Sequence, residues 1–147
     1  MNKIALFPGS FDPYTKGHEY IVSKGLEIFD EIIIGIGINT EKKYLFDLEK
    51  RIIHIEQLYM NDNRVSVKSY KGLTVDYCKE VSVSHIIRGL RNSIDFEYEK
   101  SIAQMNRSLS EIETLFILTS ESLSPINSSI VREIHKNKDD ISLFVTH

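Results

Sequence analysis

The sequence has few of the residues that stabilise secreted proteins or cross membranes. It contains one cysteine, Cys78, and no tryptophan, so an internal disulfide is excluded, and such chains are typical of a reducing compartment. Its apolar runs are short, and none approaches the roughly 18 residues of a membrane-spanning helix. The first run, Ile4 to Phe7, ends at Pro8-Gly9 and is too short for a secretion signal. We therefore expect a cytoplasmic protein that binds no membrane.

An excess of positive charge is also missing. Lysine and arginine number 18 against 21 for aspartate and glutamate, which gives a formal net charge of -3. No nucleic-acid partner is expected, because proteins that bind nucleic acid usually carry a positive field. Any phosphate group must instead be bound by a local cluster of basic residues. No cysteines and histidines have the spacing of a zinc site, so no residue is assigned as a metal ligand.

Two common nucleotide-binding motifs are absent as well. Gly35-Ile36-Gly37 lacks the third glycine of a dinucleotide-binding fingerprint, and no GxxxxGK[ST] segment occurs. These absences argue against a dehydrogenase and a P-loop enzyme. The chain has 147 residues, of which 41% are hydrophobic and 27% charged, a size and composition that predict one domain over residues 1–147.

Short apolar runs alternate with segments of helical periodicity along the chain. The alternation is typical of an α/β fold, and the run Ile32-Ile33-Ile34 indicates a central parallel strand that is covered on both faces. We predict a Rossmann-like, doubly wound parallel sheet of about five strands with helices on both faces. The expected strands are 4–7, 31–38, 64–70, 85–87 and 114–118, and the expected helices begin near residues 18, 47, 75, 95 and 128.

In such a fold ligands bind at the carboxyl ends of the strands. The loops there are 8–17, 39–46, 70–74, 88–95 and 119–127. The first loop brings Gly17 and His18 to the start of a helix, where free N–H groups attract anions and His18 can add a further N–H donor. The alternative is a plain turn with a surface histidine.

Basic residues mark two other loops at this edge. Arg88 and Arg91 follow a strand, and guanidinium groups bind phosphate oxygens well. Lys42 follows the most apolar strand. Solvated basic loops are the alternative for both. In the last loop, the serines and Asn127 can bind a ligand or cap the final helix.

Four motifs connect these residues with a known family. The run Gly9-Ser10-Phe11-Asp12-Pro13 followed by Thr15-Lys16-Gly17-His18 resembles the T/HxGH signature of the nucleotidyltransferase superfamily. Ile86-Ile87-Arg88-Gly89-Leu90-Arg91, Asp95-Phe96-Glu97-Tyr98-Glu99 and Met105-Asn106-Arg107 narrow the resemblance to bacterial phosphopantetheine adenylyltransferases.

The resemblance implies transfer of the adenylyl group of ATP to 4'-phosphopantetheine, giving dephospho-coenzyme A and pyrophosphate, the penultimate step of coenzyme A synthesis. The acceptor phosphate would attack in line, without a covalent enzyme intermediate, and Mg2+ would accompany the nucleotide. The resemblance also implies a homohexamer and coenzyme A as a possible feedback inhibitor.

Site residues follow from the same resemblance. His18 would stabilise the charge that develops at the α-phosphate, with Lys42 and Arg91 as further catalytic residues. Phosphopantetheine would contact Ser10, Lys42, Thr74 and Arg88. ATP would contact Ser10, Phe11, His18, Gly89, Leu90, Arg91, Glu99, Leu123, Ser124, Pro125, Ile126, Asn127, Ser128 and Ser129.

Two other functions stay open at this point. One is a nucleotidyltransferase with a different phosphate acceptor, such as glycerol 3-phosphate or nicotinamide mononucleotide. The other is a non-catalytic sensor of adenine nucleotide or coenzyme A, which would bind ATP without releasing pyrophosphate.

Overall fold

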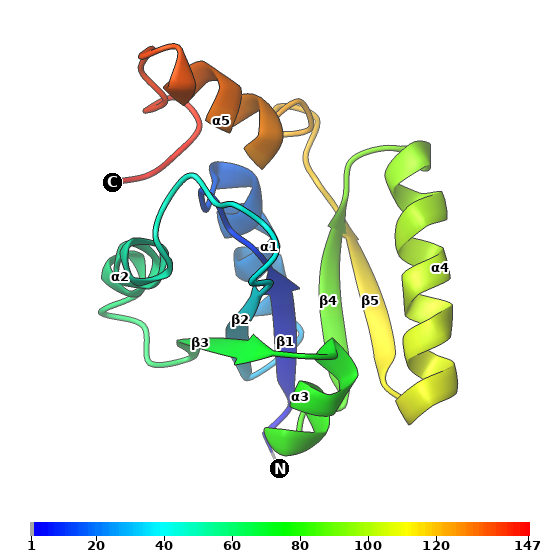
Figure 1. The fold of residues 1–147 in the computed structure, drawn as a ribbon. Coiled ribbons are helices and arrows are strands. Elements are labelled where there is room, and N and C mark those ends of the chain that lie inside the picture. The colour runs from blue at the N-terminus through cyan, green and yellow to red at the C-terminus, as the bar shows by residue number, and fades with distance from the viewer. Residues whose placement is uncertain (1) are drawn as a thin grey trace.

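Strands and helices alternate through residues 2–147, which a computed structural model describes (Figure 1). This alternation is the one that the sequence predicts. The elements in chain order are β1 (Ile4–Gly9), α1 (Lys16–Gly25), β2 (Glu31–Ile38), α2 (Leu48–Leu58), β3 (Val65–Lys71), α3 (Thr74–Glu80), β4 (His85–Leu90), α4 (Ser93–Ser110), β5 (Glu113–Leu118) and α5 (Ser128–Lys136).

The five strands form one parallel sheet in the order β3-β2-β1-β4-β5. The chain first builds outward from β1 to β3, then crosses back to β4 and builds the other half of the sheet. The direction therefore changes between β1 and β4, and their carboxyl ends diverge there to leave a crevice for a ligand. The predicted fold class is confirmed.

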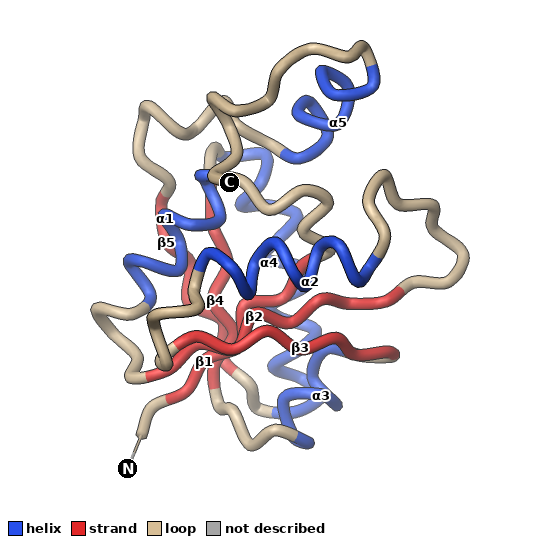
Figure 2. The backbone as a smooth tube through the Cα atoms, turned by 90° about the vertical axis from the view of Figure 1, so that its left-hand side faces the viewer, coloured by secondary structure: helices blue, strands red, loops and turns tan. Residues whose placement is uncertain are grey.

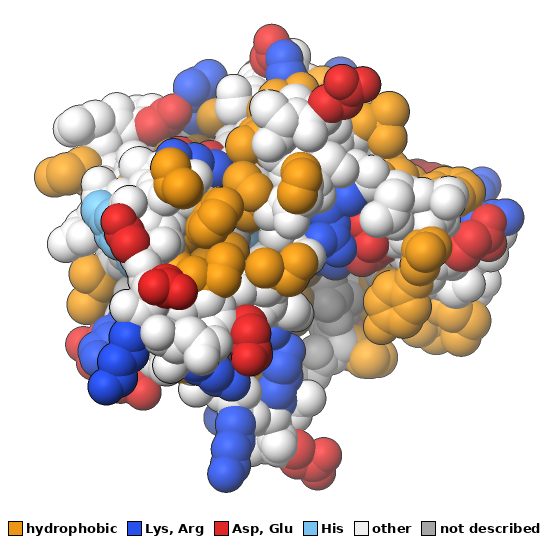
Figure 3. Space-filling model, turned by 90° about the horizontal axis from the view of Figure 1, so that it is seen from above, with side chains coloured by type: hydrophobic (Ala, Val, Ile, Leu, Met, Phe, Trp, Pro, Cys, Tyr) orange, Lys and Arg blue, Asp and Glu red, His pale blue; other side chains and the backbone are white. Residues whose placement is uncertain are grey.

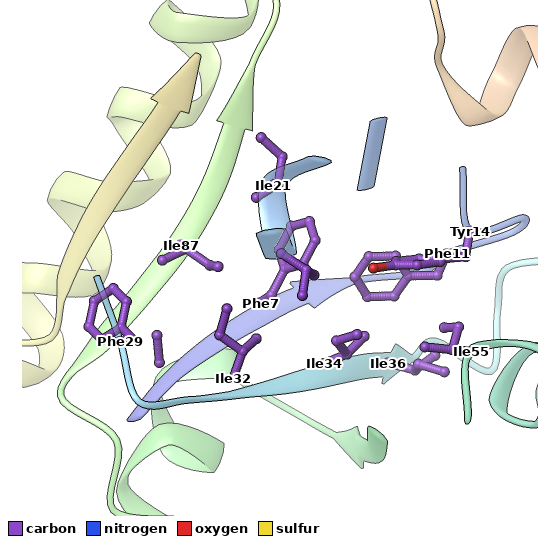
Figure 4. Packing of buried hydrophobic residues seen from close by; sticks show 12 residues of the cluster. Phe7, Phe11, Tyr14, Ile21, Phe29, Ile32, Ile34, Ile36, Ile55 and Ile87 are labelled. Carbon is purple, nitrogen blue, oxygen red and sulfur yellow. The ribbon is translucent and has the colours of Figure 1, made fainter. Parts of the chain in front are cut away.

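Helices cover both faces of this sheet. Phe7 and Ile34 point to the face covered by α1 and α2 (Figure 4), and both are buried there with Ile55 of α2. Leu6, the neighbour of Phe7 along β1, points the other way and packs with Cys78 of α3. Figure 2 shows α3 on the opposite side of the sheet from α2. Alternate burial of this kind is expected of a parallel strand covered on both sides.

Two helices begin earlier than predicted. Helix α1 begins at Lys16 instead of His18, because Thr15 is the residue that caps it. Helix α4 begins at Ser93 instead of Asp95, since the side chain of Asn92 accepts the Asp95 N–H at 2.9 Å. His18 consequently lies inside the first turn of its helix.

The end of β4 was predicted as loop and is strand. Arg88 pairs with Phe116 and Leu90 with Leu118 of β5, so the strand continues through Gly89 to Leu90. Pairing with β5 outweighs the low tendency of glycine to occur in strands. Arg88 is therefore held by the sheet itself, and only Arg91 and Asn92 connect the strand to α4.

The C-terminal part of the chain packs above the carboxyl edge of the sheet. Val131 of α5 is buried with Ile141 and Val145 in a separate small core, which lies above the ends of β1 and β4 in Figure 1. The N–H of Lys16 donates to the carbonyl of Phe144 at 2.8 Å and ties this part to α1. In residues 2–147, every helix is too short or too polar to span a bilayer.

Candidate active site

Two cavities lie at the carboxyl edge of the sheet, where the fold predicts a ligand. The first has a volume of about 340 Å³ and lies between the loop after β1, the end of β4 and the start of α5. The second has about 430 Å³ and extends toward Tyr70, Thr74 and α4. Both are lined by Ser10, Lys42, Arg88 and Glu99, so they form one cleft with a shared wall. Figure 3 views this side from above, with apolar side chains gathered beside lysine and arginine.

Most of the residues predicted for the site line this cleft. The first cavity is lined by Ser10, Phe11, His18, Lys42, Arg88, Gly89, Arg91, Glu99, Ile126, Asn127, Ser128 and Ser129. Thr74 lines the second cavity together with Ser10, Lys42, Arg88 and Glu99. Four predicted ATP contacts, Leu90, Leu123, Ser124 and Pro125, line neither cavity. Leu90 is buried in the sheet.

His18 is fixed by the first turn of α1. The Thr15 hydroxyl accepts the backbone N–H of His18 at 3.4 Å, and His18 Nδ1 accepts the backbone N–H of Thr15 at 2.8 Å. This reciprocal pair is a capping box in which histidine replaces the usual glutamate. Because Nδ1 acts as an acceptor, the proton of the neutral ring is on Nε2.

Aromatic rings enclose His18 outside this hydrogen bond. Tyr14 stacks on the imidazole with ring centroids 5.3 Å apart, and Phe11 meets it edge-on at 4.9 Å. Burial, with the positive charges of Arg88 and Arg91 as smaller causes, lowers the pKa of His18 from 6.5 to about 3. His18 is therefore neutral near pH 7 and offers one N–H donor to the cleft.

Arg88 lies in the wall between the two cavities. Its Nε and one terminal nitrogen donate to both oxygens of Glu99 at 3.0 and 2.7 Å, and the other terminal nitrogen donates to the carbonyl of Pro8. A guanidinium group held on two sides in this way has a fixed orientation. Its side chain is 32% exposed, which leaves part of the cation open to a ligand.

Arg91 forms a matching pair with Asp95, which lies one turn before Glu99 in α4. It donates to Asp95 through Nε at 2.9 Å and through a terminal nitrogen at 3.1 Å, and its backbone N–H also donates to this carboxylate. Both arginines thus carry a carboxylate partner from α4. The end of β4 and the short connection to α4 therefore present two oriented cations to the first cavity.

Lys42 is a further cation of the wall that the two cavities share. It follows β2, lines both cavities, and its Nζ lies 5.4 Å from the ring centroid of Tyr44. The Tyr44 hydroxyl in turn accepts the backbone N–H of Asn39 at 3.2 Å. The ring thus supports the lysine at the mouth of the cleft.

The start of α5 closes the first cavity. Asn127 caps this helix, since its side-chain oxygen accepts the N–H of Ile130 at 2.8 Å. Ser128 donates to the carbonyl of Pro13 at 2.9 Å. Asn127 therefore makes the capping contact that the sequence offered as the alternative to ligand binding, and Ser128 ties the start of α5 to the loop after β1. Both residues also line the cavity.

Charged residues near the site that were not predicted include Arg132 and Asp12. Arg132 lines the first cavity and donates to the Asp12 carbonyl at 2.9 Å. Its position near the start of the last predicted helix was the feature of the sequence that could have indicated a place in the site. Asp12 is 2% exposed, and its carboxylate accepts the N–H groups of Leu45 and Phe46 at 2.7 and 2.9 Å. Nothing in the local sequence indicates these distant partners.

Comparison with known proteins agrees with this geometry. The cytidylyltransferase-like family matches residues 6–134. A phosphopantetheine adenylyltransferase of Flavobacterium psychrophilum is 54% identical over 96% of this chain and 93% of its own length. One of Cytophaga hutchinsonii is 49% identical over 100% of this chain and 99% of its own.

Solved structures support the fold. A bifunctional NMN adenylyltransferase/ADP ribose pyrophosphatase from Francisella tularensis superimposes with a TM-score of 0.76 at 18% identity, covering 99% of this chain and 45% of that one. At this identity the likeness concerns the fold alone. The family match and the sequence relatives establish that the chain belongs to the phosphopantetheine adenylyltransferase family, and the cleft that brings His18, Arg88 and Arg91 together agrees with this.

Proposed function

We propose that this protein is the enzyme that transfers the adenylyl group of ATP to the phosphate of 4'-phosphopantetheine, giving dephospho-coenzyme A and pyrophosphate. The observation that carries the proposal is the identity of 45–54% to phosphopantetheine adenylyltransferases over most of the chain. The two joined cavities give the proposal a physical basis, because a reaction between two substrates needs two adjacent sites with a common wall.

Each cavity suits one of the substrates. ATP would occupy the first, with its phosphates between Arg91 and the start of α5. The pantetheine arm would occupy the second, beside Thr74 and the apolar face of α4, with its phosphate at the shared wall among Ser10, Lys42 and Arg88. In this arrangement the acceptor phosphate meets the α-phosphorus of ATP at the boundary between the cavities.

The reaction requires positioning and charge stabilisation more than acid–base chemistry. An oxygen of the acceptor phosphate is already anionic, so it forms the new P–O bond while the bond between the α-phosphorus and pyrophosphate breaks. The neutral imidazole of His18 would donate its Nε2 proton as a hydrogen bond to an α-phosphate oxygen. A donor that is fixed before the reaction stabilises the transition state without reorganisation.

Magnesium belongs to the proposal as a partner of the nucleotide. Residues 2–147 hold no cluster of three or more metal-ligating side chains, and the carboxylates of Asp95 and Glu99 are engaged by arginines. Mg2+ keeps several waters and is commonly bound through substrate phosphates, so in this cleft, whose carboxylates pair with arginines, the metal would enter on the phosphates of ATP. The bound ion would neutralise phosphate charge.

We also propose that the chain assembles as a homohexamer in the cytoplasm and that coenzyme A inhibits it. An apolar stripe on α4 supports self-association: Ile94, Tyr98, Met105 and Leu109 are all more than half exposed. Coenzyme A shares its pantetheine arm with the acceptor, which supports binding in the same cleft. Light scattering and inhibition assays test these two points.

The function is tested by the products that the protein makes. Purified protein is mixed with ATP, Mg2+ and 4'-phosphopantetheine, pyrophosphate release is followed, and the organic product is identified by mass. Glycerol 3-phosphate and nicotinamide mononucleotide serve as rival acceptors. Dephospho-coenzyme A is the expected product. Turnover of a rival acceptor alone, or ATP binding without pyrophosphate release from any acceptor, would overturn the proposal in favour of another transferase or a nucleotide sensor.

A further inference from the structure

A buried arginine lies behind the cleft, outside the residues discussed as ligand contacts. Arg51 of α2 is 5% exposed. Its Nε donates to the carbonyl of Phe46 at 3.0 Å, and a terminal nitrogen donates to the carbonyl of Ser10 at 2.7 Å. Among the ion pairs of residues 2–147, none includes Arg51. Burying a cation without hydrogen-bond partners is costly. The two backbone carbonyls are therefore the hydrogen-bond acceptors that stabilise this buried guanidinium group.

Arg51 joins the two loops that carry the predicted phosphate ligands. Ser10 belongs to the loop after β1, and Phe46 ends the loop after β2 that contains Lys42. Asp12 makes the reciprocal connection, because its carboxylate accepts two N–H groups of the second loop at 2.7 and 2.9 Å. The two loops are thus cross-linked by buried charges that bond to backbone groups.

In the first loop, Arg51 bonds to the backbone beside a strained residue. Phe11 has φ 49°, a left-handed conformation that a residue with a side chain adopts at a cost. Arg51 binds the carbonyl of Ser10, which immediately precedes Phe11. The ring of Phe11 then packs against His18 with a centroid distance of 4.9 Å. The arginine therefore supports the backbone conformation that places Phe11 against the imidazole.

In the second loop, Arg51 acts through Tyr44. Its guanidinium carbon lies 4.2 Å from the centroid of the Tyr44 ring, and Nζ of Lys42 lies 5.4 Å from the same centroid. Lys42 is exposed, so this ring is a main support for its position. Without Arg51, the Tyr44 ring would lose the guanidinium group that packs on it, and Lys42 would lose a fixed support.

We propose that Arg51 is a positioning residue for the acceptor phosphate: it holds Ser10 and Lys42, which both line the shared wall, without contacting the substrate. The inference rests on the proposed function, since it assigns the acceptor phosphate to these two residues. Of the contacts assigned to ATP, Arg51 bonds directly only to the Ser10 backbone, whereas Arg91 and the start of α5, where the ATP phosphates are assigned, are held by bonds that do not include it. Loss of Arg51 must therefore affect the two substrates unequally.

The test compares the kinetics of Arg51→Lys and Arg51→Met with those of wild type. We expect KM for 4'-phosphopantetheine to rise and kcat to fall by about tenfold each in Arg51→Met, because small displacements of binding groups are costly in rate. KM for ATP stays within about threefold of wild type. Arg51→Lys gives an intermediate loss, since an ammonium group keeps the charge but not the fork.

Ile55→Val is the matched control. Ile55 lies one turn along α2 from Arg51 and is buried without contacting the cleft. Its truncation reduces stability, as measured by Tm, while KM for both substrates stays at the wild-type value. If the Arg51 variants resemble Ile55→Val in both KM values, or if both KM values rise equally, the positioning role is refuted.

A second variant covers the case in which Arg51 variants do not fold. Tyr44→Leu keeps Arg51 but removes the ring beside Lys42. Titration calorimetry with 4'-phosphopantetheine alone is expected to give a Kd about tenfold weaker than wild type, with ATP binding unchanged. An unchanged Kd would overturn the inference. Wild-type protein that makes no dephospho-coenzyme A would instead refute the proposed function, so the two failures are distinguishable.

Discussion

Arg88 and Glu99 form a two-pronged ion pair in the wall that the two cavities share, with N–O distances of 3.0 and 2.7 Å. The pair gives Glu99 a role that the resemblance alone did not indicate. Its carboxylate is already occupied by the guanidinium group, so we expect Glu99 to orient Arg88 toward the acceptor phosphate.

Glu99→Gln tests this relationship. The amide loses the charge and one of the two acceptor positions, so Arg88 loses its fixed orientation, and kcat/KM for 4'-phosphopantetheine is expected to fall about tenfold. Steady-state kinetics with each substrate varied in turn provide the measurement. Glu113→Gln is the control, because Glu113 pairs with the exposed Arg107 outside the cleft. A loss confined to KM for ATP would contradict the orienting role.

His18→Ala is expected to lower kcat by about 100-fold or more, because it removes a donor placed at the reacting phosphate. The fold should persist, with a stability loss of about 1 kcal/mol from the broken capping box. Rapid-quench turnover and urea unfolding measure the two effects. His85→Ala is the control, since His85 lies at the amino end of β4, away from the cleft at the carboxyl ends of the strands. Near-normal turnover in His18→Ala would remove this residue from the mechanism.

The pH dependence of His18 follows from its surroundings. Burial, then Arg88 and Arg91, lowers its pKa to about 3, so the free protein should keep this ring neutral between about pH 5 and pH 8. Because the unfolded chain binds this proton near pH 6.5, stability is lost as pH falls below that value. Proton NMR of the imidazole C–H signals tests the expectation, and an inflection for His18 between about pH 6 and pH 7 would contradict it.

Asn127 provides a test at the start of α5. Asn127→Ala removes the side-chain acceptor for the Ile130 N–H and should cost about 1 kcal/mol of stability. Asn127→Ser keeps an acceptor and should cost less. Urea midpoints at constant m value measure the difference. An Asn127→Ala variant as stable as wild type would show that the cap contributes nothing to the folded state.

The parts of the fold that depend on local pattern could be predicted. The strand Glu31–Ile38 was expected over the same residues, because a run of β-branched side chains between polar loops has few other interpretations. Gly89 was misplaced in a loop, since its strand conformation comes from pairing with Ile117 of β5. Pairing between distant strands leaves no mark in the local sequence.

The same distinction applies to the site. His18 and Arg88 belong to short motifs and were predicted. Arg51 and Arg132 were not, because their backbone partners Ser10 and Asp12 lie 41 and 120 residues away. Leu123 to Pro125 were expected at the nucleotide from the resemblance and do not line either cavity. Side chains that support a site through the fold are visible only in three dimensions.

The mechanism is tested most directly by stereochemistry at the α-phosphorus. ATP made chiral there by sulfur substitution is converted with 4'-phosphopantetheine, and the configuration of the thio-dephospho-coenzyme A is determined. A single in-line attack by the acceptor phosphate predicts inversion, because the new bond forms opposite the departing pyrophosphate. Retention would indicate two successive displacements through an adenylylated enzyme and would contradict the account.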